Sequence, residues 1–151
     1  MRRPAFTVIA AGVALATATS AISASAATKP KTHTLKGSYD VTALPDPTVE
    51  ATDETGTNCA NINPESVDLH SLNLPGKGLL NVALNATDPT GTALDWDLYL
   101  LDSKGNELGE STGGSSAEQI ITPAKGKVTI KAFNLMGAPT ATVTYSYTYK
   151  K

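Results

Sequence analysis

Three residues near the middle of the chain, Asp68, His70 and Ser71, have the side-chain types that acyl-transfer enzymes use. That chemistry needs a base held between a nucleophile and a carboxylate, at about 3 Å from each. On a strand, Asp68 and His70 would face one way and Ser71 the other, because successive side chains alternate. We therefore expect His70 to be an exposed strand residue and predict that the protein is not an enzyme, with a small secreted hydrolase as an alternative.

Two carboxylates, Asp95 and Asp97, raise a second question, since they lie two residues apart in the β-like run DWDLYLL. In an extended chain they share one face, about 7 Å apart along the strand. Calcium takes about six to eight oxygen ligands, so a site would need more ligands, from Asp88 or from an acidic loop. We expect hydrogen bonds that cap or pin a loop, and no cofactor. Calcium stays open, and the residues of any metal site are unknown.

The acidic loop is the irregular stretch PDPTVEATDETGTNCANINP, between Pro45 and Pro64. With about twenty residues it is longer than most loops in compact domains, so it either contains a short strand around Val49 or forms a mobile surface loop. It holds Cys59, the only cysteine, which cannot form a disulfide within the chain. One cysteine and two histidines, all well separated, are too few for zinc. The acids of the loop are Asp46, Glu50, Asp53 and Glu54.

From Leu35 onward the chain consists of short β segments separated by turn residues, without a helical period. Their number and spacing predict an all-β, jelly-roll-like antiparallel β-sandwich of about eight strands over residues 35–151. The predicted strands are residues 36–43, 66–74, 79–86, 94–102, 107–111, 117–122, 127–134 and 140–149.

Specific turns separate these strands. Leu74-Pro75-Gly76-Lys77 places glycine third, where a type II turn needs positive φ, and should reverse the chain. Asp102-Ser103-Lys104-Gly105 has aspartate first and glycine last, as in a type I turn of a bulged hairpin. Further reversals are expected at residues 123–126 and 137–139.

Two strands carry aromatic residues that either fill the core or bind a ligand. Trp96, Leu98 and Leu100 share one face of their strand and are predicted to be core residues. Near the C-terminus, Val143, Tyr145, Tyr147 and Tyr149 share one face of ATVTYSYTYKK. Exposed tyrosines would form a platform for sugar rings or proline-rich chains, whereas a half-buried terminal strand would place them in the core. We predict core packing, with Tyr149 partly exposed. A carbohydrate-binding module that uses Trp96 or the tyrosines is the alternative.

The N-terminal region has the features of a secretory signal peptide: Arg2 and Arg3, an apolar run, and an A-x-A site that predicts cleavage after residue 26. No later segment reaches the roughly 20 apolar residues of a membrane span, so we expect a secreted, extracellular and monomeric product that does not insert into membranes.

Residues 27–34, which include His33, are predicted to be a flexible tether. Without Arg2 and Arg3, ten basic and 14 acidic residues remain, a net charge of −4, and no basic patch is present for nucleic acid.

The order of these motifs resembles the bacterial pre-peptidase C-terminal domain over roughly residues 36–150. The similarity lies in Asp68 opening a strand, the Pro75-Gly76 turn, the run from Asp97 to Leu100, the Asp102 to Gly105 turn, and a strand led by Gly126 before a tyrosine-rich last strand. The resemblance implies a non-catalytic module that binds an extracellular protein or polysaccharide. It also implies calcium near an N-terminal acidic segment, comparable here to the region of Glu50, Asp53, Glu54 and Asn58. No peptidase precedes the module, which favours a free-standing binding protein.

Overall fold

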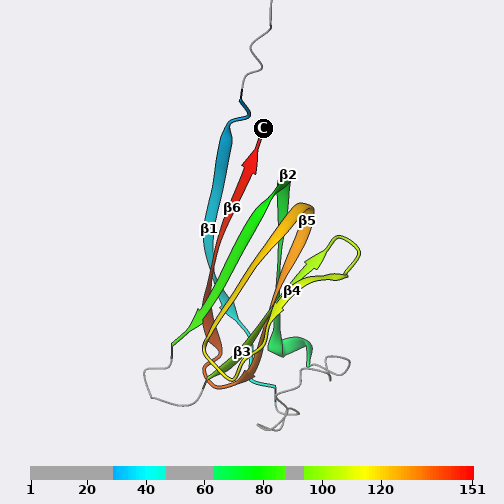
Figure 1. Cartoon of the computed structure of the whole chain (residues 1–151). Helices are drawn as coiled ribbons and strands as arrows, with labels where there is room; N and C mark the ends of the chain where they lie inside the picture. Colours follow the sequence, from blue (N-terminus) through cyan, green and yellow to red (C-terminus); the bar gives the residue numbers. More distant parts are fainter. Residues whose placement is uncertain (1–28, 47–62, 88–93) are drawn as a thin grey trace, which may run out of the picture.

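The computed structural model describes residues 29–46, 63–87 and 94–151 (Figure 1). These residues form β-strands and one short 3-10 turn, so the all-β prediction is confirmed. The elements are β1 (Thr32–Thr42), η2 (Pro64–Ser66), β2 (Val67–Ala86), β3 (Asp95–Asp102), β4 (Glu107–Ser111), β5 (Ala117–Met136) and β6 (Thr140–Lys150). The predicted signal peptide, residues 1–26, lies outside the described residues.

The strands of the described chain form one six-stranded antiparallel sheet in the order β1-β6-β2-β5-β3-β4. The prediction of about eight strands is wrong in number, although the predicted segments are close to those observed. Segments 66–74 and 79–86 are the two halves of β2, and segments 117–122 and 127–134 are the two halves of β5. They count as single strands because the ladder between β2 and β5 continues on both sides of each turn.

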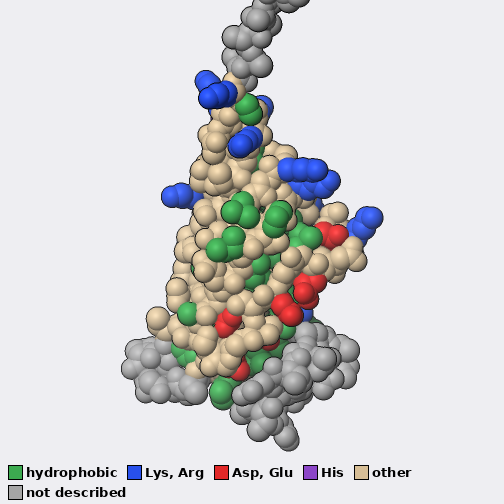
Figure 2. Space-filling view, in the orientation of Figure 1, with side chains coloured by type: hydrophobic (Ala, Val, Ile, Leu, Met, Phe, Trp, Pro, Cys, Tyr) green, Lys and Arg blue, Asp and Glu red, His purple; other side chains and the backbone are tan. Residues whose placement is uncertain are grey.

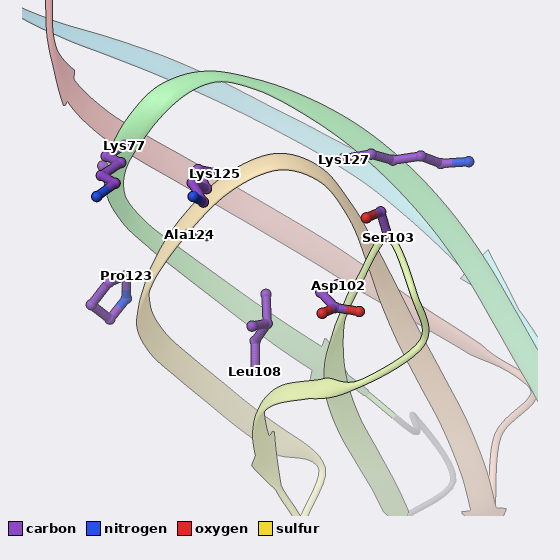
Figure 3. Close-up of a pocket in the computed structure, with 9 residues that line it drawn as sticks. Lys77, Asp102, Ser103, Leu108, Pro123, Ala124, Lys125 and Lys127 are labelled. Atoms are coloured by element: carbon purple, nitrogen blue, oxygen red, sulfur yellow. The ribbon is translucent and has the colours of Figure 1, made fainter.

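Both long strands bend back at the same end of the molecule, and β5 follows the course of β2 (Figure 1, Figure 3). The pairing changes register here, with Leu74 opposite Gly126 and Gly78 opposite Ala124, so residues 75–77 of β2 lie opposite Lys125 alone. Gly76 has φ 104° and Gly126 has φ 67°, a conformation that costs glycine little. The reversals predicted at 74–77 and 123–126 are therefore present, but as bends within paired strands.

The core is a single apolar cluster to which both halves of each bent strand contribute. Leu72 and Leu74 come from before the bend of β2, and Leu80, Val82 and Leu84 come from after it. On β3, the side chains of Trp96, Leu98 and Leu100 are each 0% exposed, which confirms the predicted core face. Burying each such side chain stabilises the fold by about 1.5–3 kcal/mol, so these residues fix the register of β3.

The C-terminal strand β6 packs its tyrosine face inward, as predicted. Val143 and Tyr147 are fully buried, and Tyr145 and Tyr149 are partly buried against the same core. The Tyr147 hydroxyl donates to two backbone carbonyls, Gly76 O at 2.7 Å and Ala124 O at 3.0 Å. A single side chain thus joins the bend of β2 to the bend of β5.

The predicted tether overlaps the first strand. β1 begins at Thr32 and pairs with β6 along its whole length, starting with Thr32 opposite Lys150. Backbone hydrogen bonds between Lys31 and Lys151, at 3.2 and 3.1 Å, extend this ladder. Residues 32–34 are therefore strand, because β6 offers them a free edge to pair with.

Candidate functional site

A pocket of about 490 Å³ lies against the two bends, and we call it the bend pocket (Figure 3). It is bounded by the bends of β2 and β5 on one side and by the turn between β3 and β4 on the other. The residues that line it are Lys77, Gly78, Asp102, Ser103, Leu108, Pro123, Ala124, Lys125 and Lys127. Residues from Lys77 to Lys127, far apart in the sequence, are thus brought to one surface.

Hydrogen bonds hold the β3–β4 side of the pocket in a defined geometry. Asp102 Oδ1 accepts from the backbone N–H groups of Lys104, at 2.7 Å, and Asn106, at 2.9 Å. Asp102 Oδ2 accepts from Asn106 Nδ2 at 2.9 Å, and Gly105 has φ 83°. The predicted turn is confirmed. The bonds from Asn106 lower the pKa of Asp102, so this carboxyl stays charged in neutral solution.

The charges and the apolar surface of the bend pocket are separated. Lys77 and Lys125 extend from the two bends, whereas the Lys127 amine points away from the pocket (Figure 3). Asp102 and Ser103 lie on the opposite side, and Leu108 points between the two groups (Figure 3). The three lysines are exposed, and within residues 29–46, 63–87 and 94–151 no ion pair neutralises them. The pocket therefore offers positive charge on one side and hydrogen-bond acceptors on the other.

The surface around the pocket has the same polarity. In Figure 2, lysines gather on the half of the molecule that carries the bends and the chain ends, and most acidic side chains lie on the other half. This separation occurs although the whole chain has a net charge of only −2. The bend end, defined here by Lys77, Lys125 and Lys127, is thus locally cationic.

Asp68, His70 and Ser71 do not assemble into a catalytic group. The His70 ring stacks on the Tyr39 ring, with centroids 3.9 Å apart, and is half-buried, so the prediction of an exposed His70 is wrong. Ser71 faces the other side of β2, where its Oγ lies 3.4 Å from Thr129 Oγ1. Burial raises the pKa of Asp68, and the charge of His70 partly opposes that shift. His33, at the start of β1, stacks on Tyr149 at 5.3 Å.

A serine in a nucleophile-like sequence was missed by the sequence analysis. Residues 109–113, GESTG, match the G-x-S-x-G spacing of hydrolases, in which the serine occupies a strand-to-helix turn. Ser111 is instead the last residue of β4, and the next element is the strand β5. Its Oγ donates to Glu118 Oε2, and neither histidine contacts it. The motif therefore lacks the structural context that its chemistry requires.

Asp95 and Asp97 begin β3, and the second of them is buried. Asp97 is 4% exposed and lies opposite Phe133 of β5. Tyr99 donates its hydroxyl to Asp97 Oδ2 at 3.1 Å, and burial raises the pKa of Asp97 to about 6. Glu118 is buried nearby and accepts from Ser111 and Ser115. Hydrogen bonds thus hold both carboxylates, although the bond to Asp97 comes from its own strand and not from a loop.

The remaining candidate ligands for calcium lie mostly outside the described residues: Glu50, Asp53, Glu54, Asn58 and Asp88. Cys59, which is not a candidate ligand, also lies outside them. Asp46 is described; it is buried and its Oδ2 accepts from the Asn63 N–H at 3.1 Å. In the described part of the chain, no three His, Cys, Asp or Glu side chains gather into a group that could hold a metal ion. The calcium prediction therefore stays a prediction.

The lysines of the bend pocket were not identified from the sequence, although a signal for them exists. Each bend contains Gly and Lys in adjacent positions, in PGKG and AKGK, and both were interpreted only as turns. The lysines of the two bends come close together only because β2 pairs with β5, which places Leu74 opposite Gly126. Two separate turns become one cationic surface through that pairing.

Comparison with known proteins gives no match to a protein-family model and none to a curated protein. Among the described residues, no helix has the length and apolar character needed to cross a bilayer.

Proposed function

We propose that this chain is a secreted, non-catalytic β-sandwich module, similar to the pre-peptidase C-terminal domain, that binds an extracellular protein or polymer at the bend pocket. The observation that carries the proposal is the pocket itself, whose exposed lysines form no ion pair within the described residues. Two hydrogen bonds from Tyr147 hold the backbone of the bends before any ligand arrives, and glycine at 76 and 126 permits its positive φ angles. A surface that is already ordered loses less entropy when it binds, which favours affinity.

The sandwich arrangement is supported by the way the sheet bends. The two halves of β2 and of β5 contribute to one apolar cluster, together with β3 and β6. Strands that change layers at a bend are a known means of building two packed layers. The filled core leaves the surface of the bends and loops as the place where ligands would bind.

A carbohydrate-binding module that uses surface aromatics is less well supported. Trp96 and Tyr147 are both 0% exposed, and a stacking platform needs open ring faces. Tyr149 is only partly buried but already stacks on His33 and Tyr147. If the module binds sugars, the contacts are therefore expected at the bend pocket and not at an aromatic platform.

Hydrogen–deuterium exchange of the purified chain tests the proposal. Backbone amides of residues 74–78, 102–108 and 123–127 should gain protection when a bound protein or polymer covers the pocket, while those of β1 should not change. The ligand panel should include neutral and charged polysaccharides and extracellular proteins. Protection elsewhere, or none with any ligand, would contradict the proposed site. Turnover of an ester, peptide or glycoside that His70→Ala abolishes would contradict the non-catalytic proposal.

A further inference from the structure

The bend pocket contains chemical groups that suit one class of polymer. Its cations are lysines, which are compact charges on flexible stems and carry no planar fork for a specific anion. All ten basic residues after residue 26 are lysines. Exposed lysines gain little energy from each anion, so useful affinity requires several contacts at once. A polymer with repeated anionic groups satisfies that requirement, whereas a single small anion does not.

Groups other than the lysines distinguish a sugar polymer from other polyanions. Asp102 and Ser103 lie across the pocket from Lys77 and Lys125 (Figure 3). Asp102 Oδ2 accepts a hydrogen bond from Asn106 Nδ2, and a carboxylate oxygen has room for a second donor. A bound hydroxyl could donate to this oxygen, and the Ser103 hydroxyl could donate or accept. Leu108 and Pro123 add apolar surface between these groups, which suits the C–H face of a sugar ring.

From this arrangement we propose that the bend pocket binds an acidic polysaccharide, with its carboxylates at Lys77 and Lys125 and its hydroxyls at Asp102 and Ser103. The proposal rests on the proposed function and names the ligand class for the same site. Asp102 also contributes to selection, because its negative charge disfavours an anionic group on its own side of the pocket. Lys127, whose amine points away from the pocket, would contact a neighbouring unit of the same polymer (Figure 3).

Binding to polygalacturonate, measured by biolayer interferometry on the full chain, tests the inference. The double variant Lys77→Gln/Lys125→Gln should bind about tenfold more weakly, because two exposed charge contacts of about 0.7 kcal/mol each are lost. The matched control is Lys29→Gln/Lys36→Gln, which removes the same charge from two exposed lysines that do not line the pocket and should bind like the wild type. Uncharged dextran should not bind, and raising the salt from about 50 to 200 mM should weaken polygalacturonate binding.

A second variant separates sugar recognition from attraction by charge alone. Ser103→Ala should weaken polygalacturonate binding about threefold and leave binding of inorganic polyphosphate, which has no sugar hydroxyls, unchanged. Equal binding by wild type and the lysine double variant, or an equal response of both polymers to Ser103→Ala, would overturn the inference. If dextran or a protein protects the bends from exchange and polygalacturonate does not, the inference fails while the proposed function stands. If no ligand protects the bends, both fail.

Discussion

The two ends of the sheet differ in where their charged side chains lie. At the bend end, charges lie outside: Lys77 and Lys125 are exposed, and the buried carbonyls of the bends accept from Tyr147. At the opposite end, which we call the carboxylate end and define by Asp97 and Glu118, charges lie inside, held by neighbouring hydroxyls. The stability of the bend end should therefore not change with pH in the moderate range. Its affinity for a charged ligand should depend on salt concentration. The carboxylate end should make stability depend on pH.

The largest expected effect tests whether close packing fixes the bends. A Cβ at Gly78 would overlap Thr148 O, a backbone atom, and would also meet the ring of Tyr147. Because the backbone cannot swing aside, Gly78→Ala should lower the free energy of unfolding by about 3 kcal/mol, as overpacking typically does. Urea denaturation measures this change.

The matched control for Gly78→Ala is Gly114→Ala in the loop before β5. A Cβ at Gly114 meets nothing within 4 Å, so this variant should keep the wild-type stability or gain slightly. Equal stability of the two variants would show that β2 and β6 can accommodate a methyl group at residue 78, which would contradict the prediction.

The second prediction concerns the hydroxyl that joins the bends. Tyr147→Phe keeps the ring in the core but removes both hydrogen bonds, to Gly76 O and Ala124 O. Loss of a donor to buried carbonyls should cost about 2 kcal/mol of stability in urea denaturation. Hydrogen–deuterium exchange should become faster near residues 75–77 and 124–126. Tyr149→Phe is the control, because no hydrogen bond of its hydroxyl is present among the described residues, and it should change stability little. A similar loss in both variants would contradict the role assigned to Tyr147.

The bend at residues 75–76 and the core face of β3 follow from local sequence, whereas the environment of the carboxylates does not. Glycine after proline at 75–76, and the alternation around Trp96, are short-range patterns with a direct physical cause, and the structure confirms both. The burial of Asp97 depends on residues that other strands bring to it, and its buried neighbour Glu118 comes from β5, the strand beside β3. The pairing that continues through both bends, and so forms the pocket, is equally non-local. Alternation in one strand cannot reveal which of its faces is covered.

The third prediction concerns Asp97 at the carboxylate end, where we expect the substitution to raise the stability and not to lower it. Burial raises the pKa of Asp97 from its usual 3.8 to about 6, so the folded state holds a proton more tightly than the unfolded state does. Between these values the folded state binds more protons, and stability should fall as the pH rises from about 4 to 6 and stay lower above that. Asp97→Asn cannot ionise and should be more stable than the wild type by about 1 kcal/mol at pH 7.5, with part of the gain offset by a weaker bond from Tyr99.

Thermal melts of both proteins from pH 4 to 8 measure the effect of Asp97→Asn. The difference between the two curves isolates Asp97 from Asp68, whose pKa burial also raises. A difference that stays constant with pH would show that folding does not shift the pKa of Asp97. A variant less stable than the wild type at pH 7.5 would show that Asp97 stabilises the fold as a charged group.

The smallest expected effect tests whether the exposed lysines of the bend end contribute to stability, in addition to the backbone that carries them. Lys77, Lys125 and Lys127 are exposed and form no ion pair within the described residues, so replacing all three with glutamine breaks no ion pair there. The free energy of unfolding should change by less than about 0.5 kcal/mol, as for most surface substitutions. Urea denaturation at low salt is the measurement, because screening is then weakest. A loss as large as that of Tyr147→Phe would mean that the lysines support the bends, and their use in binding would then be inseparable from folding. An unchanged stability would leave the lysines free to act on a ligand, because the frame that presents them is held by Tyr147 and by the close packing at Gly78.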